Sequence, residues 1–220
     1  ITKLRKGAKG EGLTFYGPEE AIIAYNLGKV DVHAIINVVV KDLDKDGNIV
    51  DVMMKETSVG RVIVNQIVPD EVGYLNTVIS KKSLRDIISD VIKKVGVARA
   101  CEFLDGIKNL GYYMSFKGGL SFNLEDIIIP KEKEELVRRG NEEIDQIMAN
   151  YNMGFITDNE RYNQVVDTWT HVNSDLSDIL YKTIKDDDQG FNSVFMMLDS
   201  GARGSKEQIR QLSGMRGLMA

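Results

Sequence analysis

The 220-residue chain is poor in the residues that build disulfide or zinc-held scaffolds: it has one cysteine, two histidines and three prolines. Because Cys101 is alone, a disulfide framework and a cysteine metal cluster are excluded. His33 and His171 lie far apart, without neighbouring residues at the spacing of zinc ligands. No run approaches the roughly 18 apolar residues of a membrane span, and no signal peptide is visible. We therefore expect a cytoplasmic chain with no metal site and no membrane contact.

An excess of basic charge is also absent. The chain has 28 basic and 33 acidic residues and a formal net charge of -5. Such a chain does not bind DNA or RNA through its overall charge, so any contact with a polyanion must come from a local patch. The hydrophobic content of 43% is typical of a globular protein. The length allows one large domain or two small ones.

Neither end has the features of a natural terminus. The chain begins at Ile1 rather than at methionine, and it stops at Ala220 soon after an apolar run, without a polar tail. We expect a segment of a larger protein. The alternative is a trimmed form of a complete protein.

The first 60 residues predict one helix and two strands. Proline and two acids open a helix at 18–21 in the expected way, and Gly28 ends it. Residues 30–40 are rich in β-branched side chains, which favours a strand. A turn at 44–48 leads to a returning strand at 49–55.

The pattern then becomes helical. Apolar residues at spacings of three and four predict a helix over 81–95. Gly96 separates it from a second helix at about 98–110. Residues 112–122 are expected to be extended, and Pro130 marks the boundary of this part of the chain.

Two long helices are predicted after Pro130. Apolar stripes run on both sides of a short turn at 152–154, so the two helices must fold back as an antiparallel hairpin over 131–188. Thr157 and Glu160 have the spacing of a capping box at the start of the second helix.

The tip of this hairpin is apolar for a turn. It contains Tyr151, Met153 and Phe155, and these exposed apolar residues favour a binding site for a partner protein. The alternative is a purely solvated hairpin, since its first arm is densely acidic. The acids are Glu132, Glu134, Glu135, Glu142, Glu143 and Asp145.

The segment 199–220 is locally basic. Its four cations are Arg203, Lys206, Arg210 and Arg216. Ser205 and Gln208 predict a capping box, so a helix begins at about residue 206 and Arg203 precedes it. Glycines beside an arginine near a helix start suit close approach to phosphate. The alternative is a glycine-rich connector with solvent-facing arginines, and the pattern alone does not separate the two.

The amino-acid sequence of this segment resembles that of the β′ subunit family of bacterial RNA polymerases, in the region just upstream of the bridge helix. The most specific match is 191–198 followed by 199–220, and the similarity covers essentially the whole chain. Further matching stretches lie in the same order at 8–12, 17–21, 57–61, 67–69, 127–130 and 160–163.

The resemblance implies an α+β fold in three parts. Residues 1–130 correspond to a mixed pore domain of short strands and helices, similar to Rpb1 domain 3. Residues 131–188 correspond to the rim-helix hairpin of the funnel. Residues 189–220 correspond to a basic helical funnel segment that leads to the active site and the bridge helix.

The resemblance also implies roles for single residues around a secondary channel through which nucleotides enter. Arg203 matches the arginine that contacts the incoming triphosphate. The residues expected to line the approach are Met197, Arg210 and Gln211. Gre-type and DksA-type factors are expected to dock at the hairpin tip, on Tyr151, Met153, Phe155, Arg161 and Asn163.

The implied activity is that of DNA-directed RNA polymerase, a nucleotidyltransferase that transcribes DNA into RNA. The implied partners are two α subunits, β, ω and sigma, together with nucleoside triphosphates, DNA template and RNA, in a nucleoid-associated enzyme. The family's magnesium-binding aspartate motif belongs before residue 1, and the bridge helix and trigger loop follow residue 220. We therefore expect no catalytic residue and no cofactor site in this chain, with Mg²⁺ bound elsewhere, and no activity of the chain alone.

Three positions depart from the pattern of relatives that bind the alarmone ppGpp. Gln164 follows Asn163 where those relatives have a lysine, and Ala98 and Asn109 replace a lysine and a tyrosine, although Asp105 is kept. These departures argue against alarmone binding. Two alternatives of other classes stay open: a free-standing interaction protein and a small nucleotide-binding domain acting alone.

Overall fold

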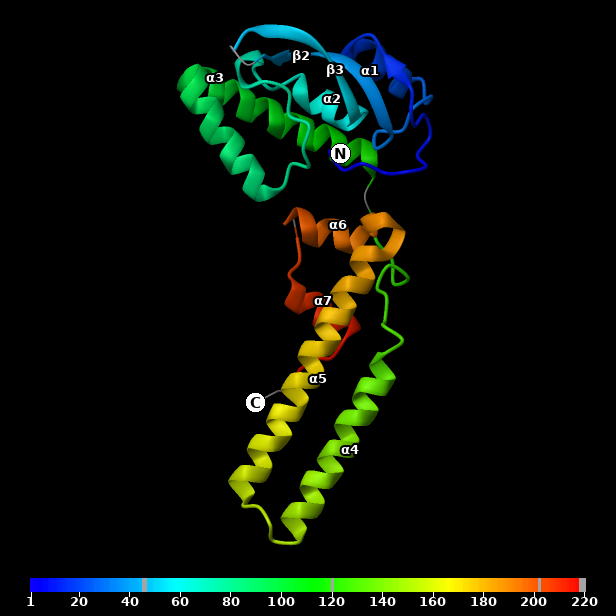
Figure 1. Ribbon diagram of the computed structural model, residues 1–220, viewed down its shortest axis with the longest axis vertical. Coiled ribbons are helices and arrows are strands. Elements are labelled where there is room, and N and C mark those ends of the chain that lie inside the picture. Colours follow the sequence, from blue (N-terminus) through cyan, green and yellow to red (C-terminus); the bar gives the residue numbers. More distant parts are fainter. Residues whose placement is uncertain (45–46, 120, 202, 218–220) are drawn as a thin grey trace. The chain divides into compact units, whose positions relative to one another are not determined.

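The computed structural model describes residues 1–44, 47–119, 121–201 and 203–217. Its contacts divide the chain into two compact units, Ile1–Leu120 and Ser121–Ala220. The first unit contains a three-stranded sheet with helices, and the second is helical (Figure 1). The predicted α+β class is confirmed. None of the helices in the described ranges is both long and apolar enough to cross a membrane.

The sheet of the first unit has the order β1-β2-β3. Strand β1 (Thr14–Phe15) pairs in parallel with β2 (Ile35–Leu43), and β2 pairs antiparallel with β3 (Ile49–Ser58). The two predicted strands are therefore present, but β2 begins later than expected because the residues just before it form turns. At the predicted turn the Asp44 backbone N–H donates to the Asn48 carbonyl, and the Asn48 backbone N–H donates to Asp44 Oδ1. Residues 45 and 46 of this turn lie outside the described ranges.

Two short helices pack with this sheet. Helix α1 (Pro18–Asn26) has the predicted bounds, and Gly28 follows it with φ 66°. Helix α2 (Val59–Asn65) begins after Ser58, whose hydroxyl accepts a hydrogen bond from the Arg61 backbone N–H at 3.2 Å. The common core is Phe15, Ala21, Val30, Ala34, Ile36, Val38, Val40, Val59 and Val62.

The motif at 57–61 is a structural clamp. Gly60 is required because a Cβ there would lie 1.9 Å from the Ile1 carbonyl oxygen. The Arg61 side chain is buried, and its Nε donates to the Thr2 carbonyl at 2.9 Å. Its Nη1 donates to the backbone and side-chain oxygens of Asn76 at 3.0 and 2.7 Å. Burial lowers the pKa of Arg61. The hydrogen bonds of its side chain join the start of the chain, the motif at 57–61 and Asn76, three segments that are distant in sequence.

Helix α3 (Lys81–Gly118) is broken at Gly96, where φ is 80° and ψ is 173°, as predicted. The expected extended segment at 112–122 is wrong over 112–118, which continue the helix. The second half of α3 continues through Gly111 to Gly118, beyond the end expected at about residue 110. The helix and the preceding 3-10 turn η1 (Asp70–Val72) surround a second core, formed by Val68, Val91, Ala100 and Phe103.

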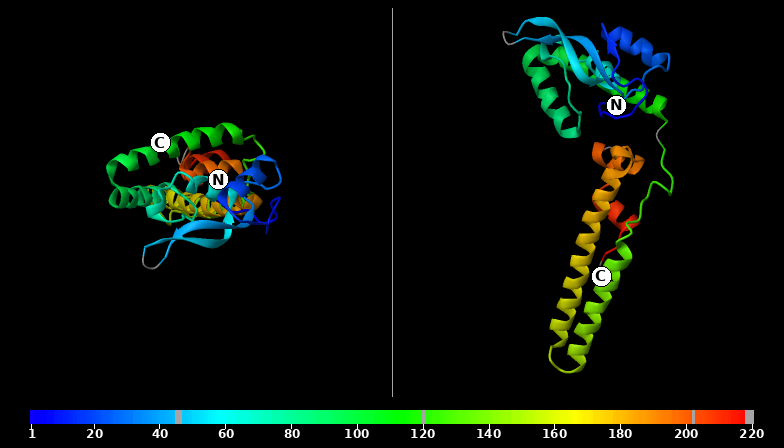
Figure 2. Two further views of the ribbon diagram at one scale, coloured as in Figure 1. Left: turned by 90° about the horizontal axis from the view of Figure 1, so that it is seen from above. Right: turned by 45° about the vertical axis from the view of Figure 1, so that its right-hand side comes forward.

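The second unit begins with the predicted hairpin. Helix α4 (Lys133–Asn152) and helix α5 (Asp158–Asp186) lie side by side and antiparallel (Figures 1 and 2). At 1.5 Å per residue the 29-residue α5 is about 43 Å long. The Thr157 hydroxyl accepts the Glu160 backbone N–H at 3.3 Å, as the capping signal predicted.

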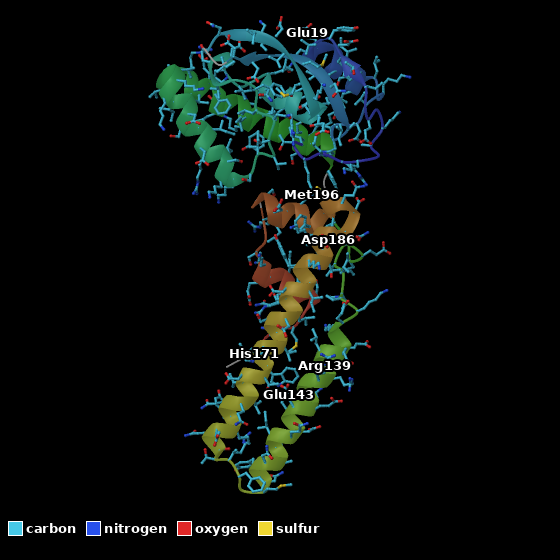
Figure 3. The ribbon with its side chains drawn as sticks, viewed as in Figure 1. Glu19, Arg139, Glu143, His171, Asp186 and Met196 are labelled. Atoms are coloured by element: carbon cyan, nitrogen blue, oxygen red, sulfur yellow. The ribbon has the colours of Figure 1, made fainter. Side chains whose placement is uncertain are left out.

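Three short elements pack on the C-terminal half of α5. They are the 3-10 turn η2 (Asp187–Gly190), α6 (Ser193–Ser200) and α7 (Lys206–Ser213). Their shared core is Leu180, Ile184, Phe195 and Ile209. The Asn192 side chain caps α6 and donates to the Asp126 carbonyl at 3.0 Å, which ties the segment after residue 121 to this core. Figure 3 labels Met196 on α6 and Asp186 at the end of α5.

Candidate functional site

Arg203 lies in the loop between α6 and α7, and both ends of that loop are fixed. Gly201 closes α6 in the left-handed conformation, with φ 69°. The Ser205 hydroxyl accepts the Gln208 backbone N–H at 3.3 Å, and Gln208 Oε1 accepts the Ser205 N–H at 3.0 Å. The predicted capping box and helix start are therefore confirmed. The Arg203 backbone N–H contacts the Met197 carbonyl at 3.5 Å.

Arg203 lines a cavity of about 410 Å³ in the second unit. The walls come from the segment after residue 121, from α6 and from α7, and they are mainly apolar. The apolar lining side chains are Phe122, Ile127, Val194, Met197, Ile209 and Leu212. Arg203, Gln208 and Gln211 supply its polar groups, so the cavity brings together Arg203, Met197 and Gln211, three of the residues predicted to face the channel.

The Arg203 side chain is exposed. Among the residues that the structure describes, it has no carboxylate within ion-pair distance. The guanidinium is therefore available to an anion that enters the cavity. A planar guanidinium presents several N–H donors in a fixed fork, which suits phosphate or carboxylate oxygens.

Arg210, the fourth predicted channel residue, has different surroundings. Its guanidinium pairs with Glu207, one turn earlier on α7, and its side chain is 18% exposed. Arg210 is not among the residues that line the cavity. Gln211 Nε2 also donates to Glu207 Oε1, at 3.3 Å. Two neighbours therefore engage the one acid of α7, which leaves Arg203 as the cation beside the cavity. A channel-lining role for Arg210 stays a prediction.

The hairpin tip exposes the apolar side chains that the sequence singled out. Tyr151 is 37% exposed, Met153 68% and Phe155 75%. The Arg161 guanidinium lies 5.2 Å from the centre of the Tyr151 ring and donates two hydrogen bonds to Asp158. Asn163 is exposed one turn into α5.

The sequence did not single out every residue of these two sites. Tyr162 is 63% exposed beside the tip. An aromatic residue in the otherwise polar first turns of a helix could have been recognised from the sequence as part of a binding surface. Phe122 and Ile127 line the cavity from about 70 residues away along the chain, and no local pattern predicts that contact.

The histidines are not brought together. His33 belongs to the first unit, where its Nδ1 lies 2.9 Å from the Lys3 carbonyl oxygen, and burial lowers its pKa. His171 is exposed on α5, and Arg139 and Glu143 lie on α4 (Figure 3). The described part of the chain has no group of three histidine, cysteine or carboxylate side chains arranged to bind a metal.

Comparison with known protein families assigns the chain to a class. The family described as RNA polymerase Rpb1, domain 3 matches residues 1–127, and RNA polymerase Rpb1, domain 4 matches residues 156–220. The first match covers more than half of the chain, so the chain belongs to the RNA polymerase Rpb1 domain 3 family.

Its relatives are bacterial. The chain is 92% identical over all 220 residues to the DNA-directed RNA polymerase subunit beta′ of Phocaeicola vulgatus and 81% identical to that of Bacteroides fragilis. It is 52% identical over 211 residues, 96% of the chain, to the subunit of Flavobacterium psychrophilum. In each case the chain spans 15% of the relative's length. The β′ resemblance inferred from the sequence is confirmed.

Proposed function

We propose that this chain is a segment of the β′ subunit of a DNA-directed RNA polymerase and forms part of the wall of its secondary channel. Two family matches in the order of Rpb1 domains 3 and 4 support this assignment. So do relatives named as that subunit, at up to 92% identity. The whole enzyme would be cytoplasmic and nucleoid-associated and would include α, β, ω and sigma subunits. It would join nucleoside triphosphates into RNA on a DNA template.

The task of the chain in that enzyme is positional. The observation that carries this proposal is the exposed Arg203 guanidinium, which lines a cavity without a carboxylate partner among the described residues. As a triphosphate passes, the guanidinium donates to its phosphate oxygens. Each such charge-assisted hydrogen bond contributes about 1.5–3 kcal/mol. Holding the phosphates in place raises the fraction of productive approaches to the reacting centre.

Magnesium belongs to the reaction of the whole enzyme, where it neutralises phosphate charge and activates the attacking oxygen. The described residues do not fit such a site, because no three carboxylate or histidine side chains converge. We therefore assign no metal ligand to this chain.

The test of the Arg203 role uses a complete polymerase whose β′ subunit carries this segment. Loss of one charge-assisted bond corresponds to about a ten- to hundredfold change. Arg203→Ala is therefore expected to raise the apparent KM for nucleotides by that factor and to leave promoter binding unchanged. Arg216→Ala is the matched control, since Arg216 is an exposed arginine of the same basic segment outside the cavity lining. An unchanged KM in Arg203→Ala would contradict the proposal.

We further propose that the hairpin tip is a docking site for Gre-type or DksA-type channel-binding factors. The exposed side chains of Met153, Phe155 and Tyr162 support it, because a cluster of exposed apolar groups at a turn is typical of a partner-binding surface. Phe155→Ser is expected to weaken factor binding to the polymerase at least tenfold. Phe116→Ser removes an aromatic side chain of the first unit that is also highly exposed, at 87% against 75% for Phe155, and serves as the control. Equal affinities of the two variants would refute tip docking.

A pull-down separates these proposals from a free-standing interaction protein that uses the same tip. Recovery of β, α and ω with the full-length subunit carrying this segment supports the polymerase assignment. Recovery of the tagged protein without any polymerase subunit supports the alternative.

A further inference from the structure

One aromatic ring of α5 contacts both helices that flank Arg203. Tyr181 and Phe195 of α6 have ring centroids 6.0 Å apart and an interplanar angle of 61°, an edge-to-face contact. The Lys206 Nζ, at the start of α7, lies 4.0 Å from the centre of the same Tyr181 ring. Tyr181 therefore joins the helix before the Arg203 loop to the helix after it.

In the described part of this loop, residues 201 and 203–205, Arg203 has few restraints of its own. Gly201 and Gly204, on either side, have φ angles of 69° and 88° and no side chains to pack. The Arg203 backbone contact with the Met197 carbonyl is long, at 3.5 Å. The position of the guanidinium therefore depends on where the end of α6 and the start of α7 are held.

The two contacts of Tyr181 act at suitable points. Phe195 is 3% exposed and belongs to the core shared by α5, α6 and α7, so the edge-to-face contact fixes the packing of α6. Lys206 is the first residue of α7, and its cation over the ring restrains the helix end nearest Arg203. Ile209 anchors the next turn of α7 in the same core.

From this geometry we infer that Tyr181 is a positioning residue for Arg203: its ring sets the spacing between α6 and α7 and so aims the guanidinium into the cavity. The inference rests on the proposed role of Arg203 toward nucleotide phosphates. In this inference the Lys206 cation interacts with the Tyr181 ring and does not bind the nucleotide. A guanidinium displaced from the phosphates binds the nucleotide less tightly, so a loosened loop is expected to raise KM.

The test compares variants in the complete polymerase. Tyr181→Leu keeps an apolar side chain but removes the ring, and we expect the apparent KM for nucleotides to rise about three- to tenfold, as expected for loss of one partly exposed cation–π contact. The kcat is expected to stay within about twofold of the original, as for lost uniform binding. Tyr181→Phe keeps both ring contacts and should match the original enzyme. Lys206→Met keeps the packing stem without the cation and should also raise KM, and Lys206→Arg should restore it.

A double-mutant cycle separates positioning from general stability. If Tyr181 acts through Arg203, Tyr181→Leu has no further effect on KM once Arg203→Ala is present. A ring that serves only folding would lower the amount of assembled enzyme and leave KM unchanged in either background.

The outcomes for the two proposals are distinct. If Arg203→Ala raises KM but Tyr181→Leu and Lys206→Met do not, the inference is wrong and the proposed function stands. If none of the three changes KM, the proposed function fails and the inference fails with it. If Tyr181→Phe raises KM as much as Tyr181→Leu, the hydroxyl and not the ring is responsible, which also overturns the inference. If the Tyr181→Leu enzyme does not assemble, the variants Lys206→Met and Lys206→Arg test the inference instead: an unchanged KM in Lys206→Met overturns it.

Discussion

The close contact between α4 and α5 at Gly140 predicts that a larger side chain at this position destabilises the hairpin. Gly140 is buried, and a Cβ at this position would lie 3.2 Å from Val172 Cγ2 and 3.3 Å from the Trp169 ring. At Gly140 the two helices approach closely because one of them lacks a side chain.

The expected energies follow from these distances. Gly140→Ala gains up to about 1 kcal/mol of helix propensity. It also forces Val172 and Trp169 to move by a few tenths of an ångström, so its net effect is small. Gly140→Val adds two further methyl groups to occupied space. Overpacking of this kind costs about 1–3 kcal/mol, so Gly140→Val should lower the free energy of unfolding of the second unit by that amount.

The chain supplies its own probe for this experiment. Trp169 is the single tryptophan of the sequence and lies at the contact, so its fluorescence reports on the hairpin. Gly140→Val should lower the urea midpoint followed by Trp169 emission and shift the native emission to longer wavelength. Gly111→Ala is the control, because Gly111 is helical, belongs to the first unit and has nothing within 4 Å of its Cβ position. An unaltered midpoint and emission in Gly140→Val would refute close packing at Gly140.

Three further predictions concern the clamp, a half-buried histidine and a helix cap. Arg61→Met leaves the carbonyl oxygens of Thr2 and Asn76 without their donor and should lower the free energy of unfolding by about 2–4 kcal/mol, measured by circular dichroism in denaturant; full rescue by Arg61→Lys would contradict the clamp. Burial lowers the pKa of His33 below 6.5, so the unfolded chain binds its proton more readily and stability should fall as pH drops through that value. His33→Gln should flatten this decline in a series of unfolding midpoints, and an equally steep decline would be the contrary result. Ser205→Ala removes the α7 cap and should cost about 1 kcal/mol in thermal unfolding, whereas Ser205→Asp should retain most of it.

The features predicted well from sequence are those decided within a few residues. The start of α1 at Pro18 and the break of α3 at Gly96 both follow from the conformations that these residues permit. The start of α7 after Ser205 follows from a reciprocal pair of hydrogen bonds within four residues. No distant contact is needed to fix these points, which is why local reasoning reaches them.

The segment 112–118 shows where local reasoning fails. Tyr112, Tyr113 and Phe116 are aromatic and favour strands by propensity, yet they are exposed on a helix. No strand of the described sheet pairs with this segment, and its other face contributes Met114 to an apolar cavity lined also by Ile107. A strand without a partner leaves its backbone groups unpaired, so the helix that already runs through Gly111 continues.

The two arginines of the last segment show what tertiary structure adds to the candidate site. Glu207 and Arg210 have the i, i+3 spacing of a helical ion pair, and the structure forms that pair. Buried Ile209 fixes the rotation of α7 about its axis, so its neighbour Arg210 stays only 18% exposed. Arg203 has Asp199 and Glu207 four residues away on either side, but it lies in the loop before the helix and forms no ion pair with a described carboxylate. The sequence thus contains a signal for which arginine is paired, but the cavity beside Arg203 requires Phe122 and Ile127 from a distant segment. The charge of Arg203 and the glycines beside it allow a contact with phosphate. Phe122 and Ile127 form part of the cavity wall and so determine from which side a ligand reaches Arg203.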